Sequence, residues 1–125
     1  MNYLIVFFGA GIGGALRHGV NGAMARLFGL NFPFGTFVVN VAGSLLMGLI
    51  AGYFAFRGEA SQPWRLFLTT GILGGFTTFS AFSLDTAMLY ERGSFGTLAF
   101  YVIASVLLSI LAVFLGLAVM RVGSQ

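Results

Sequence analysis

The stretch TTGILGGFTTFSAFSLDT, residues 69–86, decides the fold of this chain. It lies inside an apolar run long enough to cross a bilayer, yet Gly74 and Gly75 weaken helix formation within it. Hydroxyl side chains follow the glycine pair, and Asp85 adds a carboxyl group. Backbone that leaves the helix at membrane depth is tolerated only where protein or a water-filled cavity surrounds it. We therefore predict a transmembrane helix that is broken mid-membrane and lines a permeation or binding site.

The composition of the whole chain indicates that its solvent is lipid. Of its 125 residues, 58% are hydrophobic and only 7% are charged, whereas soluble domains are about a quarter charged. The six basic residues are all arginines, and they are spread too widely to form a patch that binds nucleic acid. Cysteine is absent from the sequence, which excludes disulfides and thiolate metal sites.

Four apolar segments are each long enough to cross a hydrocarbon core of about 30 Å. They cover residues 3–28, 34–56, 64–90 and 94–120, and short loops separate them. The first segment lacks the basic start and the cleavage site of a signal peptide, so we expect it to be retained as a span. These features predict an all-α integral membrane protein in which residues 1–125 form a single four-span domain.

The arginines are balanced across the predicted membrane. Three fall on the side of the two termini and three on the opposite side: Arg57, Arg65 and Arg121, against Arg17, Arg26 and Arg92. Such a balance gives almost no orientation signal. A chain that inserts both ways can pair with a second copy about an axis in the membrane plane, although a partner of fixed orientation also fits the balance.

Glycines recur at the spacing that lets transmembrane helices approach closely. Three pairs follow the G-x-x-x-G pattern: Gly9 and Gly13, Gly48 and Gly52, and Gly71 and Gly75. This pattern is typical of packed helix faces. The pairs fit association between subunits and packing within one chain equally well.

Polar side chains form rows on two of the predicted spans. Three residues of the second span and four of the fourth follow one another at steps of four: Thr36, Asn40 and Ser44, and Thr97, Tyr101, Ser105 and Ser109. Residues four apart share one face of a helix. Hydrogen bonds to a neighbouring helix would account for the shorter row, whereas the longer row favours a polar track for an ion.

Phe79 and Phe82 are three residues apart, just past the glycine pair, and therefore share a helix face. They alternate with the hydroxyl residues Ser80 and Ser83. The edges of phenyl rings are electropositive, so rings and hydroxyl hydrogens together suit a partly dehydrated anion. Residues 74–77 are expected to start a half-helix whose positive end favours an anion, while carbonyls freed by the break would instead hold a cation.

The remaining polar residues of the spans carry no reaction chemistry. Arg17 is the one arginine expected inside the membrane boundary, where it either snorkels or concentrates anions at a pore mouth. His18 has no second histidine with which to bind a metal. Asp85 has Thr86 or an arginine as a possible partner and no second carboxylate nearby, so a paired acid–base mechanism is unsupported. We therefore do not expect an enzyme.

Three stretches together resemble the small fluoride channels of the Fluc (CrcB) family. They are GGALRHGVN (residues 13–21), FPFGTFVVNVAGS (32–44) and TTGILGGFTTFSAFS (69–83), and the last is the most specific. The resemblance covers essentially the whole chain. It implies a passive, selective channel that exports fluoride across the bacterial inner membrane and lowers fluoride toxicity. Asp85 departs from the family pattern, because members often carry Glu at this position.

The resemblance also implies a dual-topology, antiparallel homodimer with two fluoride pores. It assigns the pathway to two phenylalanines, one asparagine, three residues of the fourth span and a vestibule arginine: Phe79, Phe82, Asn40, Tyr101, Ser105, Ser109 and Arg17. From their positions beside these residues, we add Thr36, Ser80 and Ser83 to the pathway. The backbone carbonyls of Gly74 and Thr77 from both subunits would hold a structural sodium ion.

Two other functions compete with a passive channel. A proton-coupled small exporter of fluoride or drug-like cations is the alternative, because small multidrug exporters are also four-spanned. Such exporters need a carboxylate in the first span, and the residues from Met1 to Leu30 contain none. A scaffold protein that transports nothing is the third possibility.

Overall fold

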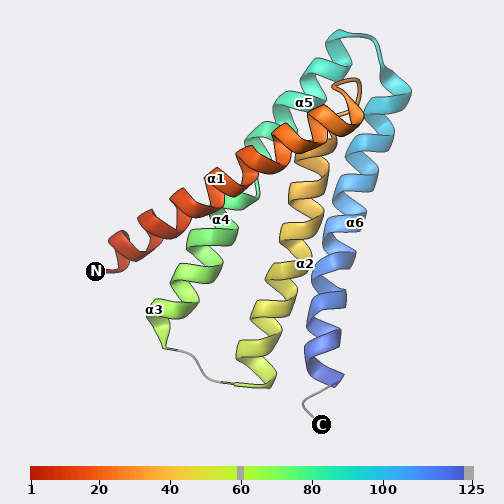
Figure 1. The fold of residues 1–125 in the computed structure, drawn as a ribbon. Helices are drawn as coiled ribbons and strands as arrows, with labels where there is room; N and C mark the ends of the chain where they lie inside the picture. The colour runs from red at the N-terminus through yellow and green to blue at the C-terminus, as the bar shows by residue number, and fades with distance from the viewer. Residues whose placement is uncertain (59–60, 123–125) are drawn as a thin grey trace.

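Every regular element in the described part of the chain is a helix (Figure 1). The computed structural model describes residues 1–58 and 61–122. In chain order the elements are α1 (Asn2–Phe28), α2 (Phe34–Phe56), α3 (Gln62–Arg65), the π-helix η1 (Leu66–Leu73), α4 (Gly74–Phe76), α5 (Phe79–Glu91) and α6 (Phe95–Val122).

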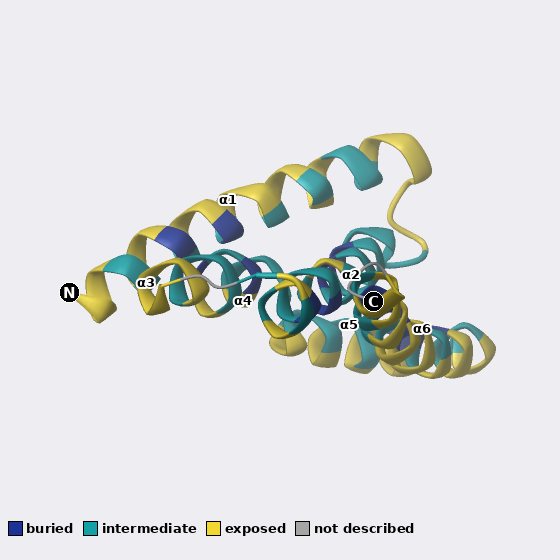
Figure 2. Cartoon of the chain, turned by 90° about the horizontal axis from the view of Figure 1, so that it is seen from below, coloured by how far each residue is buried: buried dark blue, intermediate teal, exposed yellow. Residues whose placement is uncertain are grey.

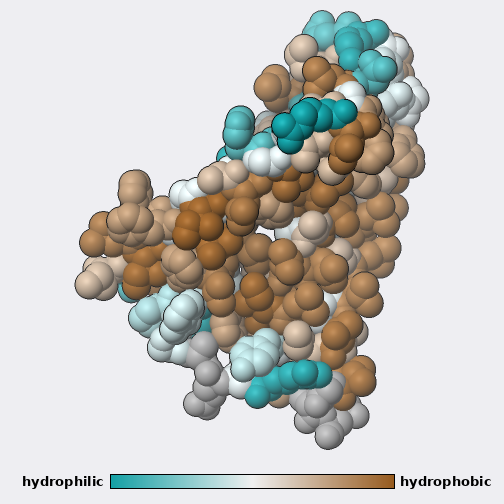
Figure 3. Space-filling view, viewed as in Figure 1, coloured by the Kyte–Doolittle hydropathy of each residue, from teal (hydrophilic) through white to brown (hydrophobic). Residues whose placement is uncertain are grey.

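Four stretches of helix are long and apolar enough to cross a membrane. They are Asn2–Phe28, Phe34–Phe56, Gln62–Glu91 and Phe95–Val122. The prediction of an all-helical protein with four membrane-spanning segments is therefore confirmed at this level. Hydrophobic side chains cover the middle of the face shown in Figure 3, and polar residues gather toward its two ends.

The third span is not one regular helix. Its first half is π-helical over Leu66–Leu73, and the short α4 that follows ends at Phe76. Thr77 and Thr78 are extended, with ψ angles of 159° and 121°, before α5 begins at Phe79. The expectation that residues 74–77 start the second half-helix is therefore wrong. Glycine weakens a helix without having to end it, and the glycine pair here is helical.

α2 and α6 run side by side in the same direction and form the centre of the molecule (Figure 1). Their backbones touch at glycines: a Cβ atom on Gly48 would overlap the carbonyl oxygen of Val113, and one on Gly116 would lie 2.7 Å from that of Leu45. One on Gly52 would lie 2.8 Å from the Cβ of Met120. Such close approach is the contact that small residues allow between transmembrane helices.

α1 packs on the third span and, through Asn21 against Gly35, on the start of α2. A Cβ on Gly9 would lie 2.9 Å from the Cα of Gly71, and one on Gly13 would overlap the carbonyl oxygen of Ile72. Gly75 packs in the same way on Ala10. Figure 2 shows the outer side of α1 exposed along its length, with Gly9 and Gly13 as its buried residues. All three glycine pairs thus make contacts within one chain.

Arginines close the two ends of the bundle by binding main-chain carbonyls. At one end the Nε of Arg57 donates to the carbonyl of Met120, 3.1 Å away near the end of α6. At the other end, Nη2 of Arg92 donates to the carbonyl of Asn31 at 3.0 Å. One of these carbonyls belongs to the last turn of a helix and the other to a loop, so the arginines have a bonding role in addition to the topological one read from the sequence.

Candidate functional site

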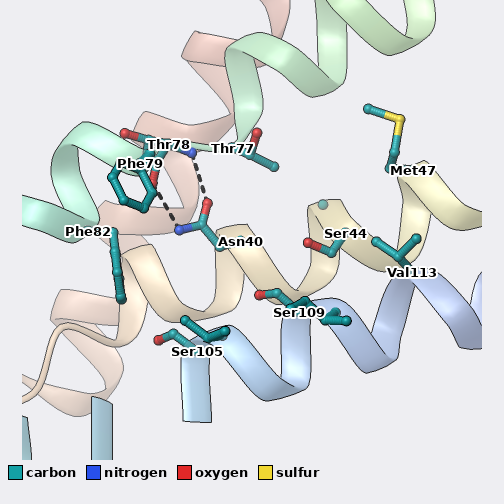
Figure 4. A pocket seen from close by; sticks show the side chains of 13 residues that line it. Asn40, Ser44, Met47, Thr77, Thr78, Phe79, Phe82, Ser105, Ser109 and Val113 are labelled. Carbon is teal, nitrogen blue, oxygen red and sulfur yellow. Dashed lines mark hydrogen bonds between the residues drawn. The ribbon is translucent and has the colours of Figure 1, made fainter. Parts of the chain in front are cut away.

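A cavity of about 390 Å³ lies where α2, α6 and the extended residues of the third span meet (Figure 4). Its polar lining comes from all three segments: Asn40, Ser44, Thr77, Thr78, Ser105 and Ser109. Its apolar lining consists of Gly43, Met47, Phe79, Phe82, Val106, Ile110 and Val113. The three segments that looked functional in the sequence thus meet at one place.

The side chain of Asn40, on α2, binds the extended part of the third span through two hydrogen bonds. Its Nδ2 donates to the carbonyl of Thr78 at 3.0 Å, and its Oδ1 accepts from the Thr78 backbone N–H at 2.8 Å. A buried backbone group outside a helix needs a partner, and one carboxamide here serves a donor and an acceptor. Asn40 therefore makes the cross-helix bond considered from the sequence, and it also lines the cavity (Figure 4).

The same interruption takes the usual donors away from two carbonyls. In an uninterrupted helix, the Gly74 carbonyl would accept from the Thr78 N–H and the Thr77 carbonyl from the Ala81 N–H. Here the Thr78 N–H is bound to Asn40, and the Ala81 N–H donates to the Thr78 side-chain hydroxyl at 3.1 Å. Both carbonyls have therefore lost their regular helical donors.

Two serine hydroxyls of α6 are buried beside the cavity without a partner. Within the described residues, neither Ser105 Oγ nor Ser109 Oγ has a hydrogen bond, and Ser105 is only 5% exposed. Serines on helices commonly bond the carbonyl four residues earlier, and these two do not. A buried polar atom that lacks a partner is costly, and a ligand in the cavity would supply that partner.

Aromatic rings line the end of the cavity at α5. The centroids of Phe79 and Phe82 lie 5.7 Å apart, and Phe82 lies 5.2 Å from the ring of Tyr101. The two phenylalanines lie on the same side of α5, as their spacing predicted (Figure 4). Phe79 is 79% exposed, so this side of the cavity is uncovered within the single chain.

A tyrosine and an aspartate form a pair that the sequence reading missed. Tyr101 is fully buried, and its hydroxyl donates to Asp85 Oδ2 at 3.0 Å. The partners expected for Asp85 were Thr86 or an arginine, but the Thr86 hydroxyl donates to the Phe82 carbonyl at 2.9 Å. A signal was present, because Asp85 and Tyr101 are equally distant from Gly93, where α5 turns back into α6.

The structure separates the other predicted pathway residues from the cavity lining. Thr36 is buried on α2, one turn before Asn40. Ser80 and Ser83 are exposed, and the Ser83 hydroxyl donates to the Phe79 carbonyl at 3.0 Å. Arg17 is half-buried on α1 and does not line the cavity. Thr78, Met47 and Val113 line it without having been singled out as site residues.

A comparison with known protein families identifies the relatives of this chain. The model of the family described as "CrcB-like protein, Camphor Resistance (CrcB)" matches residues 4–117. The chain belongs to the CrcB-like family. The resemblance inferred from three stretches of sequence is thereby confirmed, and this CrcB-like chain is a multi-pass membrane protein.

Several curated proteins are similar to this CrcB-like chain over nearly its whole length. The fluoride-specific ion channel FluC 2 of Nitrobacter hamburgensis is 64% identical over 121 residues, which cover 97% of this chain and 98% of that protein. The FluC of Methylobacterium nodulans is 62% identical, with 97% of each chain covered. That of Rhodopseudomonas palustris is 60% identical, with 97% of this chain and 98% of that protein covered.

Proposed function

We propose that this chain is a passive, fluoride-selective ion channel of a bacterial inner membrane. The observation that carries the proposal is the pair of buried, unpartnered hydroxyls, Ser105 and Ser109, on a cavity between spans. Relatives that are 60% and 64% identical are named fluoride-specific ion channels. A channel breaks no covalent bond, so the chain is not an enzyme.

The cavity offers what a small, strongly hydrated anion needs. Hydroxyl and amide hydrogens replace water of hydration, and the phenyl edges of Phe79 and Phe82 add positive potential. The lining contains no charged side chain among its residues. A nearly neutral site lets an ion leave as well as enter, which conduction requires. Arg17 serves as a vestibule charge that raises the local anion concentration.

The working unit that we propose is an antiparallel, dual-topology homodimer with two pores. Balanced arginines support insertion in both directions. The exposed ring of Phe79 beside an open cavity supports coverage by a second copy. Fluoride would move down its own gradient through each pore, which exports it whenever the cytoplasmic concentration is higher and so lowers its toxicity.

A structural sodium ion at the dimer centre is part of the proposal. The carbonyls of Gly74 and Thr77, freed of their helical donors, are the kind of ligand that sodium takes in broken membrane helices. Gly74 is exposed, so a second copy can approach it. Two carbonyls from each subunit would make four ligands, and the bound ion would join the two subunits.

A substitution at Gly74 tests the sodium site without disturbing the fold of the single chain. Within the chain, a Cβ at this position would meet only the Thr69 carbonyl oxygen, at an ordinary 3.6 Å. Gly74→Val should therefore leave the monomer intact and weaken the dimer by crowding the ion and the second copy. Size-exclusion chromatography in detergent at varied sodium measures this, and an unchanged dimer would remove the sodium site from the proposal.

A proton-coupled exporter remains the second candidate, because Asp85 is a carboxylate within the third span. Its bond to Tyr101 favours a positioning role over proton transfer. Fluoride efflux that continues without a proton gradient, or in the Asp85→Asn variant, excludes coupling. Efflux that needs both would replace the channel proposal with an exporter.

The deciding experiment is fluoride efflux from proteoliposomes, followed with a fluoride electrode while valinomycin carries potassium. Vesicles loaded with chloride are measured in parallel. Ser109→Ala is compared with the control variant Ser94→Ala, since Ser94 lies in the loop between α5 and α6. Fast fluoride efflux that Ser109→Ala slows, with silent chloride, supports the proposal. Efflux of neither anion from dimeric protein would overturn it and favour a scaffold.

A further inference from the structure

The contacts between α2 and α6 fix which residues of the two helices lie level. A Cβ on Gly48 would lie 3.0 Å from the Cα of Val113, and one on Gly52 would lie 3.4 Å from that of Leu117. The residue numbers differ by 65 in both pairs (113 minus 48 and 117 minus 52). Because the helices run in the same direction, the same offset relates each earlier turn of α2 to one of α6.

In this register, the polar rows of the two helices stop at the same level. Three successive levels are polar on both helices and the next two are apolar: Thr36 with Tyr101, Asn40 with Ser105 and Ser44 with Ser109, then Gly48 with Val113 and Gly52 with Leu117. The last polar level is that of Ser44 and Ser109. One turn further along, neither helix offers a hydrogen-bond donor from a side chain.

Met47 and Val113 form the end of the cavity at that apolar level. Both line it, and Figure 4 shows them beyond Ser44 and Ser109, away from the phenylalanines. Past them the two backbones come together, since a Cβ on Gly116 would lie 2.7 Å from the carbonyl carbon of Gly48. The cavity therefore does not continue between α2 and α6.

An ion that leaves Ser109 in this direction faces a long apolar stretch. From Val113 to the end of α6 at Val122 is about 14 Å of helix, and Arg121 is its one polar residue. An anion stripped of water without new donors is strongly disfavoured. Apolar constrictions in channels are known to act as gates because water leaves them.

We infer that Met47 and Val113 form an apolar barrier at the end of the polar rows, and that crossing it limits the rate of fluoride permeation. The inference rests on the proposed function, because it concerns the rate of the same pathway. It assigns a rate-determining role to two side chains that bind no ion.

The test adds a hydroxyl at the barrier without changing its shape. Val113→Thr places a donor one turn after Ser109, and Val119→Thr, on the exposed side of α6, is the matched control. Initial fluoride efflux from proteoliposomes should rise about tenfold for Val113→Thr, the size expected when one hydroxyl stabilises an ion at the top of its barrier. The control should conduct as the unmodified chain does.

A second variant keeps the test decisive if Val113→Thr fails to assemble. Met47→Gln is close in volume and adds an amide donor at the same level, and size-exclusion chromatography reports assembly for each variant. If the unmodified chain conducts and the assembled variants stay within twofold of its rate, the barrier inference is wrong. A silent unmodified chain would instead remove the proposed function, and the barrier with it.

Discussion

Asn40 and Thr78 exchange two hydrogen bonds although they lie 38 positions apart in the sequence. The two bonds, of 3.0 and 2.8 Å, hold Thr78, one of the two extended residues of the third span, against the middle of α2. The bond from the Thr78 N–H replaces the one that this group would make to the Gly74 carbonyl in an uninterrupted helix. The shape of the cavity and the freedom of the Gly74 carbonyl both depend on this one side chain.

Replacing Asn40 should therefore destabilise the protein as well as alter conduction. Asn40→Ala leaves the Thr78 N–H without a partner and removes one of the bonds to the Thr78 carbonyl, at an expected cost of about 1–3 kcal/mol. Circular dichroism during denaturation in mixed micelles measures the loss. Ser44→Ala, one turn further along α2, is the control and should cost less than about 1 kcal/mol. Equal stability of the two variants would contradict the role given to Asn40.

The buried serines should show the opposite relation between stability and conduction. Neither hydroxyl is satisfied within the described structure, so Ser105→Ala and Ser109→Ala remove a cost and should stabilise the fold by about 1 kcal/mol each. Both variants should conduct fluoride more slowly, because a donor for the ion is lost. Stability comes from denaturation curves and conduction from efflux. A less stable variant with full conduction would show that these hydroxyls have structural partners.

Tyr101 and Asp85 should be energetically coupled. Tyr101→Phe removes the donor from the carboxylate oxygen 3.0 Å away, and Asp85→Asn removes its charge. A double-mutant cycle on the free energy of unfolding should give a coupling of about 1 kcal/mol, because the hydrogen bond joins a buried tyrosine hydroxyl to a carboxyl oxygen. Thr97→Ala, one turn earlier on α6, combined with Asp85→Asn, provides an uncoupled comparison. Additive effects of Tyr101→Phe and Asp85→Asn would show that the contact carries no energy.

The glycines of α1 should differ sharply although they are neighbours. A Cβ on Gly13 overlaps the Ile72 carbonyl oxygen, whereas one on Gly11 meets nothing within 4 Å. Gly13→Ala should therefore destabilise the protein by about 1–3 kcal/mol. Gly11→Ala should stabilise α1 by up to about 1 kcal/mol, since alanine favours the helix. Thermal denaturation of both variants checks the sign, and a stabilised Gly13→Ala would mean that α1 does not pack on η1.

The two phenylalanines of the proposed pathway should be separable from assembly. Phe79→Ile and Phe82→Ile keep apolar bulk but lose the ring edges, so the variants should assemble as the unmodified chain does and lose at least about tenfold in fluoride efflux. Phe95→Ile is the control. Phe95 packs on Tyr90 where α5 ends and α6 begins, and it does not line the cavity. Full conduction by both variants would remove the rings from the ion pathway.

Composition made the four spans readable from sequence alone, and spacing placed Phe79, Phe82, Ser105 and Ser109 on the correct faces. The location of the helix interruption was not readable. Helix propensity is a local property and pointed to Gly74, whereas the extended conformation of Thr78 depends on a carboxamide in another helix. The position of the interruption therefore depends on contacts between spans, which the residue pattern of one helix does not contain.

The same limit explains the glycines and Asp85. The spacing of Gly9 and Gly13 predicted a close helix contact but not which helix makes it. In the structure that helix is η1. Asp85 offered several partners in the sequence, and only the turn at Gly93 brought it to Tyr101. Asp85 and Tyr101 lie the same number of residues before and after Gly93, and this equal spacing predicts that they face each other across the turn.

The attachment of α1 through glycines makes the protein sensitive to membrane thickness. With 27 residues, the helix is about 40 Å long, so it must tilt to bury its apolar length in a core of about 30 Å. A thicker bilayer should let α1 stand more upright, so lipid chain length should change the angle at which α1 crosses the third span.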